Sequence, residues 1–351
     1  MALLKYHNIS IKGISACVPK NEEAIADYPY FSEAEKERML PFFGLSRRRV
    51  APADMCASDM CIAAAKDLLE HLNWDKSTVD CLVMVTAAPD YIFPPTSCVV
   101  HNRLGLPNDC CSFDIPTGCP GWVYGLTVLG GMMSNGSIKR ALLLTGDTPT
   151  RFANPKDKSV YPFFGDAGAA TAIEYTKDTP GIVAYLGTLG NSYDKIICPA
   201  GGARHIADTD SLIEIEEAPG VIRQQTNTHM EGMDVFSLST KQDPYAIETL
   251  LNAMNKTKDD IDLFDFHITN NFLLNRVIKK IGIEKDRVPY NIENFGNVSC
   301  ASIPINLVTL ETERLRNEKL RHIGCALGVG ITFGSIYFET NKLIVPQLIE
   351  L

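Results

Sequence analysis

The two halves of the chain repeat one pattern of apolar and polar residues. Residues 68–85 align without a gap with residues 250–267, and each copy is typical of an amphipathic helix, a polar turn and a short buried strand. Farther along, residues 119–126 align with residues 300–307 at nearly the same offset. Helices that alternate with buried strands predict an α/β protein whose sheets are covered on both faces. The duplication predicts two similar halves, with a functional site where they meet.

The size and charge of the chain narrow the classes of protein to which it can belong. Its 351 residues suit two domains of ordinary size, which we place at 1–178 and 179–351. With 45% hydrophobic and 21% charged residues, the composition is typical of a soluble globular protein. A net charge of −9 argues against broad binding to nucleic acids or anionic membranes. No apolar run is long enough to cross a membrane, and the first residues lack a signal-peptide pattern.

The eleven cysteines show neither disulfide spacing nor a Cys-x-x-Cys pair. This favours a reducing compartment, and we expect a cytoplasmic protein. The sequence has no pattern of metal ligands, and its glycine clusters lack the spacing of a dinucleotide site, so we expect neither a metal nor a cofactor. Five of the eleven cysteines are expected to be small core residues, namely Cys17, Cys56, Cys61, Cys81 and Cys98.

Cys119 differs from these cysteines in its surroundings. The apolar run 110–115 predicts a buried strand, and residues 116–118 predict a tight turn. Pro120 is typical of a first helical turn. The apolar positions of the predicted helix are Trp122, Val123, Leu126, Leu129 and Met133. At a helix N-terminus the unpaired amides and the helix dipole favour an anion, so we expect a lowered thiol pKa and a cysteine nucleophile. The alternative is another structural cysteine.

Two residues of the second half are candidates to face Cys119. His267 ends the predicted strand 261–266, and Asn297 precedes the segment that aligns with the Cys119 helix. If a pseudo-twofold axis relates the halves, all three side chains point into one cleft. An amide donor at Asn297 could then stabilise a developing oxyanion. The alternatives are a packed or surface histidine and an asparagine that shapes a turn.

Several short motifs together resemble one known family. They are Phe113-Asp114-Ile115 through Cys119, Gly165-Asp166-Ala167-Gly168, Cys198-Pro199-Ala200-Gly201-Gly202, Met230-Glu231-Gly232, His267 through Asn270, Gly296-Asn297 before Ser302-Ile303-Pro304, and Gly328–Gly334. Nearly from end to end, the chain is similar to the thiolase superfamily, and specifically to β-ketoacyl-acyl-carrier-protein synthase III. The resemblance implies a five-layered αβαβα fold of two duplicated halves, which is usually a homodimer.

The resemblance also implies a reaction and the residues that perform it. Cys119 would accept an acyl group from a thioester, and the amides of Cys119 and Val329 would form the oxyanion hole. A malonyl thioester, carried in this family by acyl carrier protein, would then lose carbon dioxide while His267 and Asn297 hold its carbonyl. The enolate would attack the acyl-cysteine and give a β-ketoacyl product for fatty-acid or specialised acyl-chain synthesis.

Three further residues have a role by the same resemblance. Phe93 would reach the acyl pocket of the neighbouring subunit. Lys279 and Lys280 match a basic pair that docks the acidic acyl carrier protein. A solvated helix face is the alternative for the two lysines.

The chain departs from the family where coenzyme A is usually held. Arg38 and Phe42 stand where a tryptophan and an arginine usually clamp the adenine, and Phe272 replaces an arginine after the His-x-x-Asn motif. Phenylalanine cannot pair with phosphate, for which arginine and lysine are the usual partners. Val329 replaces a central glycine and is expected to narrow the pocket. These departures favour an acyl donor bound to a carrier protein, or an unusual acyl group, over acetyl-coenzyme A.

Two other functions stay open at the level of sequence. An acyltransferase of the same fold would pass the acyl group from Cys119 to an alcohol or amine, and it would have less use for Asn297. A non-catalytic partner subunit would typically lack the nucleophile, which is present here. The sequence leaves open the acyl chain length, the pathway, and whether coenzyme A or a carrier protein delivers the primer.

Overall fold

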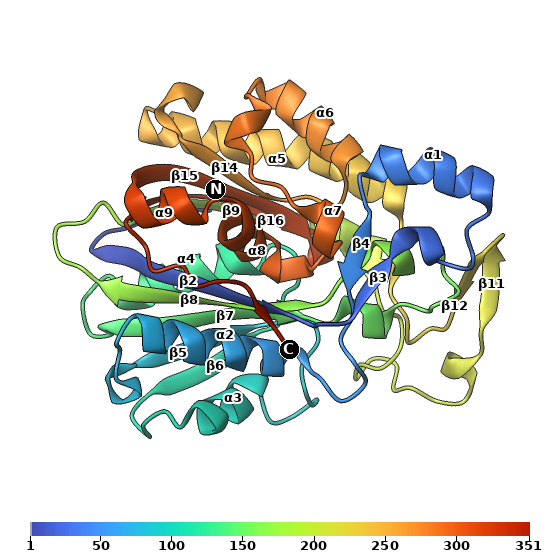
Figure 1. Cartoon of the computed structure of the whole chain (residues 1–351), viewed down its shortest axis with the longest axis horizontal. Helices are drawn as coiled ribbons and strands as arrows, with labels where there is room; N and C mark the ends of the chain where they lie inside the picture. The colour runs from blue at the N-terminus through green and yellow to red at the C-terminus, as the bar shows by residue number, and fades with distance from the viewer. Residues whose placement is uncertain (1) are drawn as a thin grey trace.

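Two β-sheets form the centre of the structure, a computed structural model that describes residues 2–351 (Figure 1). The first sheet has the order β17 (Ile349–Glu350), β2 (Ile9–Val18), β8 (Ala167–Tyr175), β7 (Arg140–Asp147), β5 (Cys81–Val85) and β6 (Cys111–Ile115). The second has the order β1 (Ala2–Tyr6), β9 (Ile182–Thr188), β16 (Thr332–Asn341), β15 (Lys319–Gly328) and β14 (Leu263–His267). Strand β5 runs parallel to both β6 and β7, and β14 runs parallel to β15.

Helices cover both faces of each sheet and produce five layers. The outer helices of the first sheet are α2 (Ala57–His71) and α3 (Thr96–Leu104). Helices α4 (Gly121–Met133) and α8 (Ser302–Leu310) lie between the two sheets. Helices α5 (Gly232–Met254) and α6 (Asn271–Ile281) cover the far face of the second sheet. The predicted αβαβα architecture is confirmed.

The remaining elements are short and lie mainly around the ends of the sheets. They are α1 (Glu33–Phe43), α7 (Ile292–Phe295), α9 (Thr312–Asn317), β3 (Glu22–Ala24), β4 (Arg47–Arg49), β10 (Ile196–Ile197), β11 (Ile215–Ala218), β12 (Val221–Arg223) and β13 (His229–Met230), together with 3₁₀ turns. None of the helices in residues 2–351 has the length and apolar character that a membrane crossing requires.

The repeat read from the sequence corresponds to a structural repeat. The 3₁₀ turns Lys76–Thr78 and Lys258–Asp260 are equivalent in the ungapped alignment, as are strands β5 and β14. Asn73 and Asn255, which the alignment pairs, both have left-handed backbones, with φ of 51° and 54°. Asparagine is one of the few residues that tolerate this conformation, so both helices end in the same way.

The two ends of the chain cross between the halves. Strand β1 pairs with β9 in the second sheet, whereas β17 pairs with β2 in the first. Each half therefore receives one edge strand from the opposite end of the sequence. The predicted boundary between residues 178 and 179 therefore groups β1 with the first sheet and β17 with the second, although each lies in the other sheet. The division into domains at this boundary stays a prediction.

Helix α4 is almost entirely apolar and mostly buried, because it lies between the two sheets. Trp122 is 1% exposed, and its indole N–H donates to the hydroxyl of Thr171 at 3.0 Å. Gly121 and Gly125 face β5 and β7, where an added Cβ would overlap with side chains of Val85 and Leu143. Small residues at these two positions let the helix lie close to the sheet. This close packing fixes the position of Cys119, two residues before the helix begins.

Candidate active site

One cavity of about 610 Å³ contains the three side chains that the sequence predicts to converge. Cys119, His267 and Asn297 all line it, although they come from both halves of the chain. Cys119 follows β6, His267 ends β14, and the cavity also receives residues that follow β7 and β15. The carboxyl ends of strands are where α/β proteins commonly bind ligands. The lining is mostly apolar, which suits an acyl chain.

Cys119 lies in the predicted sequence of strand, turn and helix, but the predicted burial of the strand is wrong. Cys111 is exposed and residues 112–115 are half-buried, because β6 lies at the edge of its sheet. Strand β6 begins at Cys111, one residue later than expected, and helix α4 begins at Gly121 with Pro120 as its N-cap. The amide of Gly121 donates to the carbonyl of Gly118 at 2.7 Å and closes the turn. The sulfur therefore lies at the N-terminus of α4, as predicted.

The expected lowering of the Cys119 thiol pKa is wrong. Burial is the largest influence and, with a smaller contribution from the nearby Asp147, raises the pKa to about 11. The hydroxyl of Ser299 and the amides of Cys119 and Val329 act in the opposite direction but do not outweigh burial. The free energy needed to bury the thiolate in an apolar site is larger than the stabilisation that the helix N-terminus gives to it. At neutral pH the resting group is the thiol.

The same two amides lie where an oxyanion hole is expected. The N–H groups of Cys119 and Val329 both hydrogen-bond toward the sulfur. Gly328 permits this approach, because a Cβ at that position would overlap with the Cβ of Cys119 and lie 3.1 Å from its sulfur. The side chain of Val329 lines the cavity, as its expected narrowing of the pocket requires.

His267 is buried, 4% exposed, and neutral. Burial lowers its pKa to about 4. Its Nδ1 lies 3.0 Å from the hydroxyl of Ser302, whereas its buried Nε2 has no hydrogen-bond partner in residues 2–351. When the Ser302 hydroxyl donates to Nδ1, the ring proton is on Nε2. The imidazole then has one free donor for a ligand oxygen.

Asn297 is fixed by its backbone and by its side-chain oxygen. Its N–H donates to the carbonyl of Phe163 at 2.8 Å, and its carbonyl accepts from Gly165 at 3.0 Å. The side-chain Oδ1 accepts from the amide of Ser299 at 3.0 Å. With Oδ1 occupied, Nδ2 is left as the donor that can reach a ligand in the cavity.

Comparisons with known proteins identify the family. Residues 113–190 match the family model described as 3-oxoacyl-[acyl-carrier-protein (ACP)] synthase III, and residues 251–340 match the model of its C terminal. A Campylobacter jejuni protein named "Putative 3-oxoacyl-[acyl-carrier-protein] synthase 3" is 32% identical, over 98% of each chain. The chain belongs to the β-ketoacyl-acyl-carrier-protein synthase III family.

Solved structures of synthase III proteins share the whole fold. A 3-oxoacyl-(acyl-carrier protein) synthase from Burkholderia xenovorans LB400 is similar with a TM-score of 0.93 and 31% identity, covering 100% of this chain and 99% of that one. A synthase III from Pseudomonas aeruginosa PAO1 has a TM-score of 0.82 and 25% identity, covering 96% and 100%. The resemblance inferred from the motifs is therefore confirmed.

Next to the cavity of Cys119 in this synthase III lies a second cavity, called the mouth below, whose lining is aromatic and uncharged. The mouth has a volume of about 450 Å³ and shares Asn297 and Thr269 with the first cavity. The ring of Phe272 stacks on Phe42 at 4.5 Å and on Phe236 at 5.2 Å, measured between centroids. No lysine, arginine, histidine or carboxylate lines this second cavity. The two departures at Phe42 and Phe272 are thus one structural feature.

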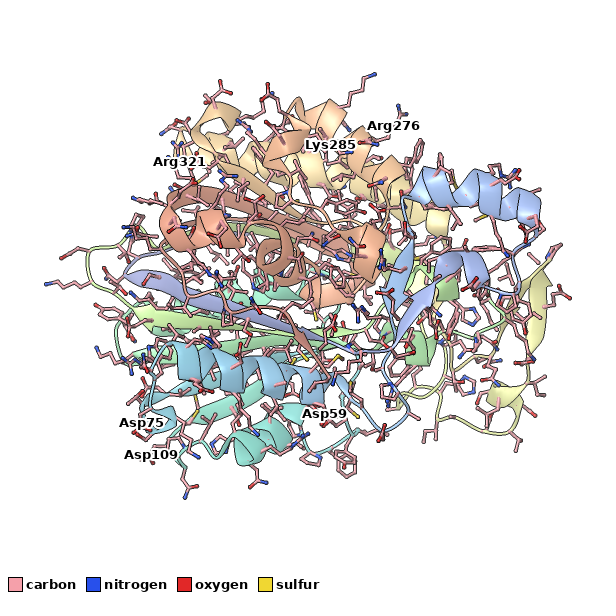
Figure 2. The ribbon with its side chains drawn as sticks, in the orientation of Figure 1. Asp59, Asp75, Asp109, Arg276, Lys285 and Arg321 are labelled. Atoms are coloured by element: carbon pink, nitrogen blue, oxygen red, sulfur yellow. The ribbon has the colours of Figure 1, made fainter. Side chains whose placement is uncertain are left out.

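Phe93 and the two lysines lie outside both cavities. Phe93 is 81% exposed and follows Ile92, which is 88% exposed. Lys279 and Lys280 are exposed in the last turn of α6, and the ammonium of Lys280 donates to the carbonyl of Thr240 at 2.9 Å. Arg276 extends outward from the same helix (Figure 2), so α6 carries three exposed cations.

Sequence reasoning missed two residues next to the nucleophile. The hydroxyl of Ser299 lies 3.9 Å from the sulfur of Cys119, and Asp147 ends β7 and lines the same cavity. A carboxylate three residues after the apolar run 141–144 was an available signal for Asp147. Ser299 has a left-handed backbone, φ 51°, which the sequence does not reveal.

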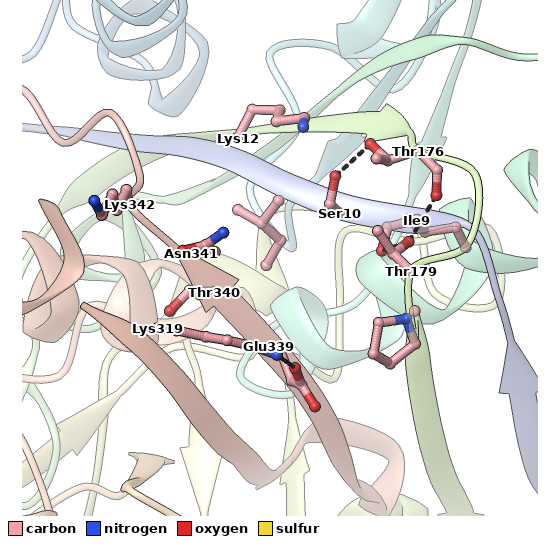
Figure 3. A pocket seen from close by; sticks show the side chains of 13 residues that line it. Ile9, Ser10, Lys12, Thr176, Thr179, Lys319, Glu339, Thr340, Asn341 and Lys342 are labelled. Atoms are coloured by element: carbon pink, nitrogen blue, oxygen red, sulfur yellow. Dashed lines mark hydrogen bonds and ion pairs between the residues drawn. The ribbon is translucent and has the colours of Figure 1, made fainter. Parts of the chain in front are cut away.

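A separate polar cavity of about 240 Å³ lies between β2 and the ends of β15 and β16 (Figure 3). Its Lys319 pairs with Glu339 at 2.7 Å, and its Lys12 pairs with Glu174 at 3.3 Å. Neither cysteine nor histidine lines it, and it shares no residue with the cavity of Cys119. Within residues 2–351 there is also no cluster of three or more His, Cys, Asp or Glu residues arranged to hold a metal ion.

Proposed function

We propose that the chain is a decarboxylating condensing enzyme that acts through an acyl-Cys119 intermediate and makes a β-ketoacyl thioester for fatty-acid or specialised acyl-chain synthesis. Family membership supports the class of reaction. The observation that carries the proposal is the single apolar cavity in which a thiol, a neutral imidazole and a free amide donor meet.

In the first step the sulfur of Cys119 attacks the carbonyl carbon of an acyl thioester. A sulfur–carbon bond forms, the bond to the donor sulfur breaks, and the donor leaves as a thiolate that takes a proton from solvent. The amides of Cys119 and Val329 stabilise the oxyanion of the tetrahedral intermediate. Both amides belong to rigid backbone, so they need no reorganisation when the charge develops.

In the second step a malonyl thioester loses carbon dioxide and its thioester carbonyl becomes an enolate. Nε2 of His267 and Nδ2 of Asn297 are the donors for that oxygen. A neutral donor imidazole suits this role, and its low pKa keeps it neutral throughout the working range of pH. The enolate carbon then attacks the acyl-cysteine, and the β-ketoacyl product leaves the sulfur.

Labelled malonyl thioester tests condensation against simple acyl transfer. With the malonyl carboxyl group isotopically labelled, the proposal expects one labelled carbon dioxide for each β-ketoacyl product. An acyltransferase would instead consume the acyl donor and an alcohol or amine, with no release of label. Acyl transfer without labelled carbon dioxide would overturn the proposal.

The uncharged mouth supports a carrier protein, rather than coenzyme A, as the bearer of the acyl donor. Coenzyme A would place a charged nucleotide beside the stacked rings of Phe42, Phe272 and Phe236, where no cation lines the cavity. A phosphopantetheine arm on a protein leaves the nucleotide out. The exposed cations of α6, which begins at this mouth, would face the acidic carrier protein.

Phe272→Arg tests the choice of donor. We expect the parent enzyme to prefer acyl-carrier protein to acyl-coenzyme A, and the variant to gain roughly tenfold in kcat/KM for acyl-coenzyme A, about the effect of one charge-assisted contact. Phe272→Leu is the control, because it opens the mouth without adding a cation. Equal use of both donors by the parent enzyme would contradict the assignment.

The basic residues of α6 have a separate test. Lys279→Glu is expected to raise KM for an acyl-carrier protein and to leave KM for a short acyl-pantetheine thioester unchanged, because only the protein reaches the helix surface. The same change in KM for both substrates would show that Lys279 acts on the cavity and not on docking.

We also propose a homodimer in which Phe93 enters the partner's acyl pocket. Support comes from β6, which is an edge strand of its sheet in residues 2–351, and from the exposed apolar side chains Tyr91, Ile92 and Phe93, which precede the helix α3 that packs on β6. Sedimentation equilibrium is expected to give twice the chain mass. Phe93→Ala is expected to change the preferred acyl chain length without dissociating the dimer, and a monomeric parent protein would contradict the proposal.

A further inference from the structure

The first step of the proposed reaction needs an acceptor for the thiol proton of Cys119. The thiol is protonated at neutral pH because burial raises its pKa to about 11. His267 is a poor acceptor, because the same burial opposes the imidazolium and lowers its pKa to about 4. Its free nitrogen is also needed as a donor in the second step. A different base has to lie close to the sulfur.

Asp147 is a buried carboxylate at the carboxyl end of β7, 2% exposed and on the wall of the same cavity. It accepts hydrogen bonds from the hydroxyl of Thr86 at 2.9 Å and from the amides of Ala87 and Ala88 at 2.7 and 3.2 Å. No lysine, arginine or histidine pairs with it among the ion pairs of residues 2–351. A buried acid held only by neutral donors can gain a proton without breaking an ion pair.

Three thiols contact Asp147 or are influenced by its charge, and the imidazole of His267 lines the same cavity. Cys300 donates to it at 3.4 Å, and Cys61 and Cys119 are close enough to feel its charge. Burial raises the pKa of Asp147, with the hydroxyls of Ser299 and Thr86 opposing the rise. A raised pKa of Asp147 lies nearer to the pKa of the Cys119 thiol. The carboxylate is therefore a better acceptor for the thiol proton.

Ser299 bridges the carboxylate and the sulfur. Its hydroxyl donates toward the sulfur of Cys119 at 3.9 Å, and the same hydroxyl is close enough to Asp147 to oppose the rise in the pKa of that carboxyl group. The side chain is held there by a left-handed backbone, φ 51°, and by the bond from its amide to Oδ1 of Asn297. A serine rarely adopts this conformation, and such backbone outliers concentrate at functional sites.

We propose that Ser299 and Asp147 form a proton relay that receives the thiol proton of Cys119 during acyl loading and returns it when the product leaves. The inference rests on the proposed function and supplies its missing base. Ser299 contacts the nucleophile, and Asp147 acts only through Ser299.

The protons that move through the relay balance over one reaction cycle. As the sulfur–carbon bond of the acyl-enzyme forms, the thiol proton passes to the Ser299 oxygen while the Ser299 proton passes to the Asp147 carboxylate. Asp147 stays protonated while Cys119 carries the acyl group. When the enolate displaces the product, the released Cys119 thiolate regains its proton by the reverse path. The one proton consumed overall comes from solvent and goes to the departing donor thiol.

The test measures the rate at which Cys119 gains acyl mass in full-length protein, between pH 7 and 9. Asp147→Asn keeps an oxygen acceptor but cannot take a proton, and Ser299→Ala removes the bridge. Both are expected to acylate roughly a hundredfold or more slowly at pH 7, the usual contribution of general base catalysis. Their rates should rise about tenfold per pH unit, since only the thiolate then reacts, while the parent rate stays level.

Cys300→Ala is the matched control, because Cys300 donates to Asp147 at 3.4 Å but makes no hydrogen bond to the sulfur of Cys119 within residues 2–351, and it should acylate like the parent. Malonyl thioester decarboxylation without an acyl donor should be kept in both relay variants, since it needs only His267 and Asn297. If Asp147 acted only through its negative charge, Asp147→Asn would acylate faster than the parent. Loss of that charge would favour the thiolate of Cys119. Faster or unchanged acylation in the relay variants would overturn the relay.

Loss of the relay and failure of the proposed function are distinguishable. The acyl-enzyme is measured before any malonyl thioester is added, so its rate does not depend on condensation. A parent protein that acylates at Cys119 and never releases carbon dioxide would refute the proposed condensation. The comparison of Ser299→Ala with the parent would still decide the relay.

Discussion

Replacement of Asn297 separates the two chemical steps. In Asn297→Ala the cavity loses the Nδ2 donor, and loss of one oxyanion donor typically costs roughly 10²–10³ in rate. The same change removes the Oδ1 acceptor of the Ser299 amide, which is buried. An unsatisfied buried amide costs about 1–3 kcal/mol, so we also expect lower stability and some movement of Ser299.

Asn297→Asp removes the Nδ2 donor but keeps an acceptor for the amide of Ser299. Its carboxylate can still accept from the amide of Ser299, but it puts an oxygen where the Nδ2 donor was. Condensation should therefore be lost at least as fully as in Asn297→Ala, while acylation of Cys119 is retained. Thermal stability should fall, because the new carboxylate is buried in an apolar site. Product chromatography measures condensation, and intact-protein mass measures acylation. Condensation by Asn297→Asp at the parent rate would refute the assigned role.

Two further substitutions test the packing and the electrostatics of the fold. Gly328→Ala should lower acylation roughly a hundredfold with the fold retained by circular dichroism, because its Cβ would displace Cys119; parental activity would show that the site tolerates movement. Burial raises the pKa of Asp243 to about 7, above that of an unfolded aspartate, so the free energy of unfolding should fall by up to about 1.4 kcal/mol per pH unit as pH rises from about 4 to about 7. Asp243→Asn should flatten this fall in melting curves recorded across that range, and an unchanged slope would assign it to other groups.

The sequence predicts most of the architecture because its information is local and is repeated. The helix, turn and strand of residues 68–85 recur at 250–267, and two copies of one pattern are strong support for paired halves. The location of Cys119 at a helix start follows from Pro120 and from the apolar spacing that comes after it. Its meeting with His267 and Asn297 follows from the symmetry of the halves.

The errors and omissions concern contacts between distant segments. The sequence predicts a lowered thiol pKa, which is the wrong direction, because it shows the helix start but not the depth of burial, and burial is the larger effect. Phe42, Phe236 and Phe272 come from three separate helices, so their stack has no local signature. Asp147 and Ser299 likewise belong to different halves of the chain and meet only in the folded structure.

The central claim, that Cys119 carries the acyl group between two reactions in one cavity, has a direct measurement. Protein loaded with an acyl group is mixed with malonyl-carrier protein, and the mass of the Cys119 peptide is followed together with the β-ketoacyl product. We predict that the adduct disappears at the rate at which product and carbon dioxide appear, with one product for each adduct. Product formed while the adduct persists, or formed equally well by Cys119→Ala, would contradict the account.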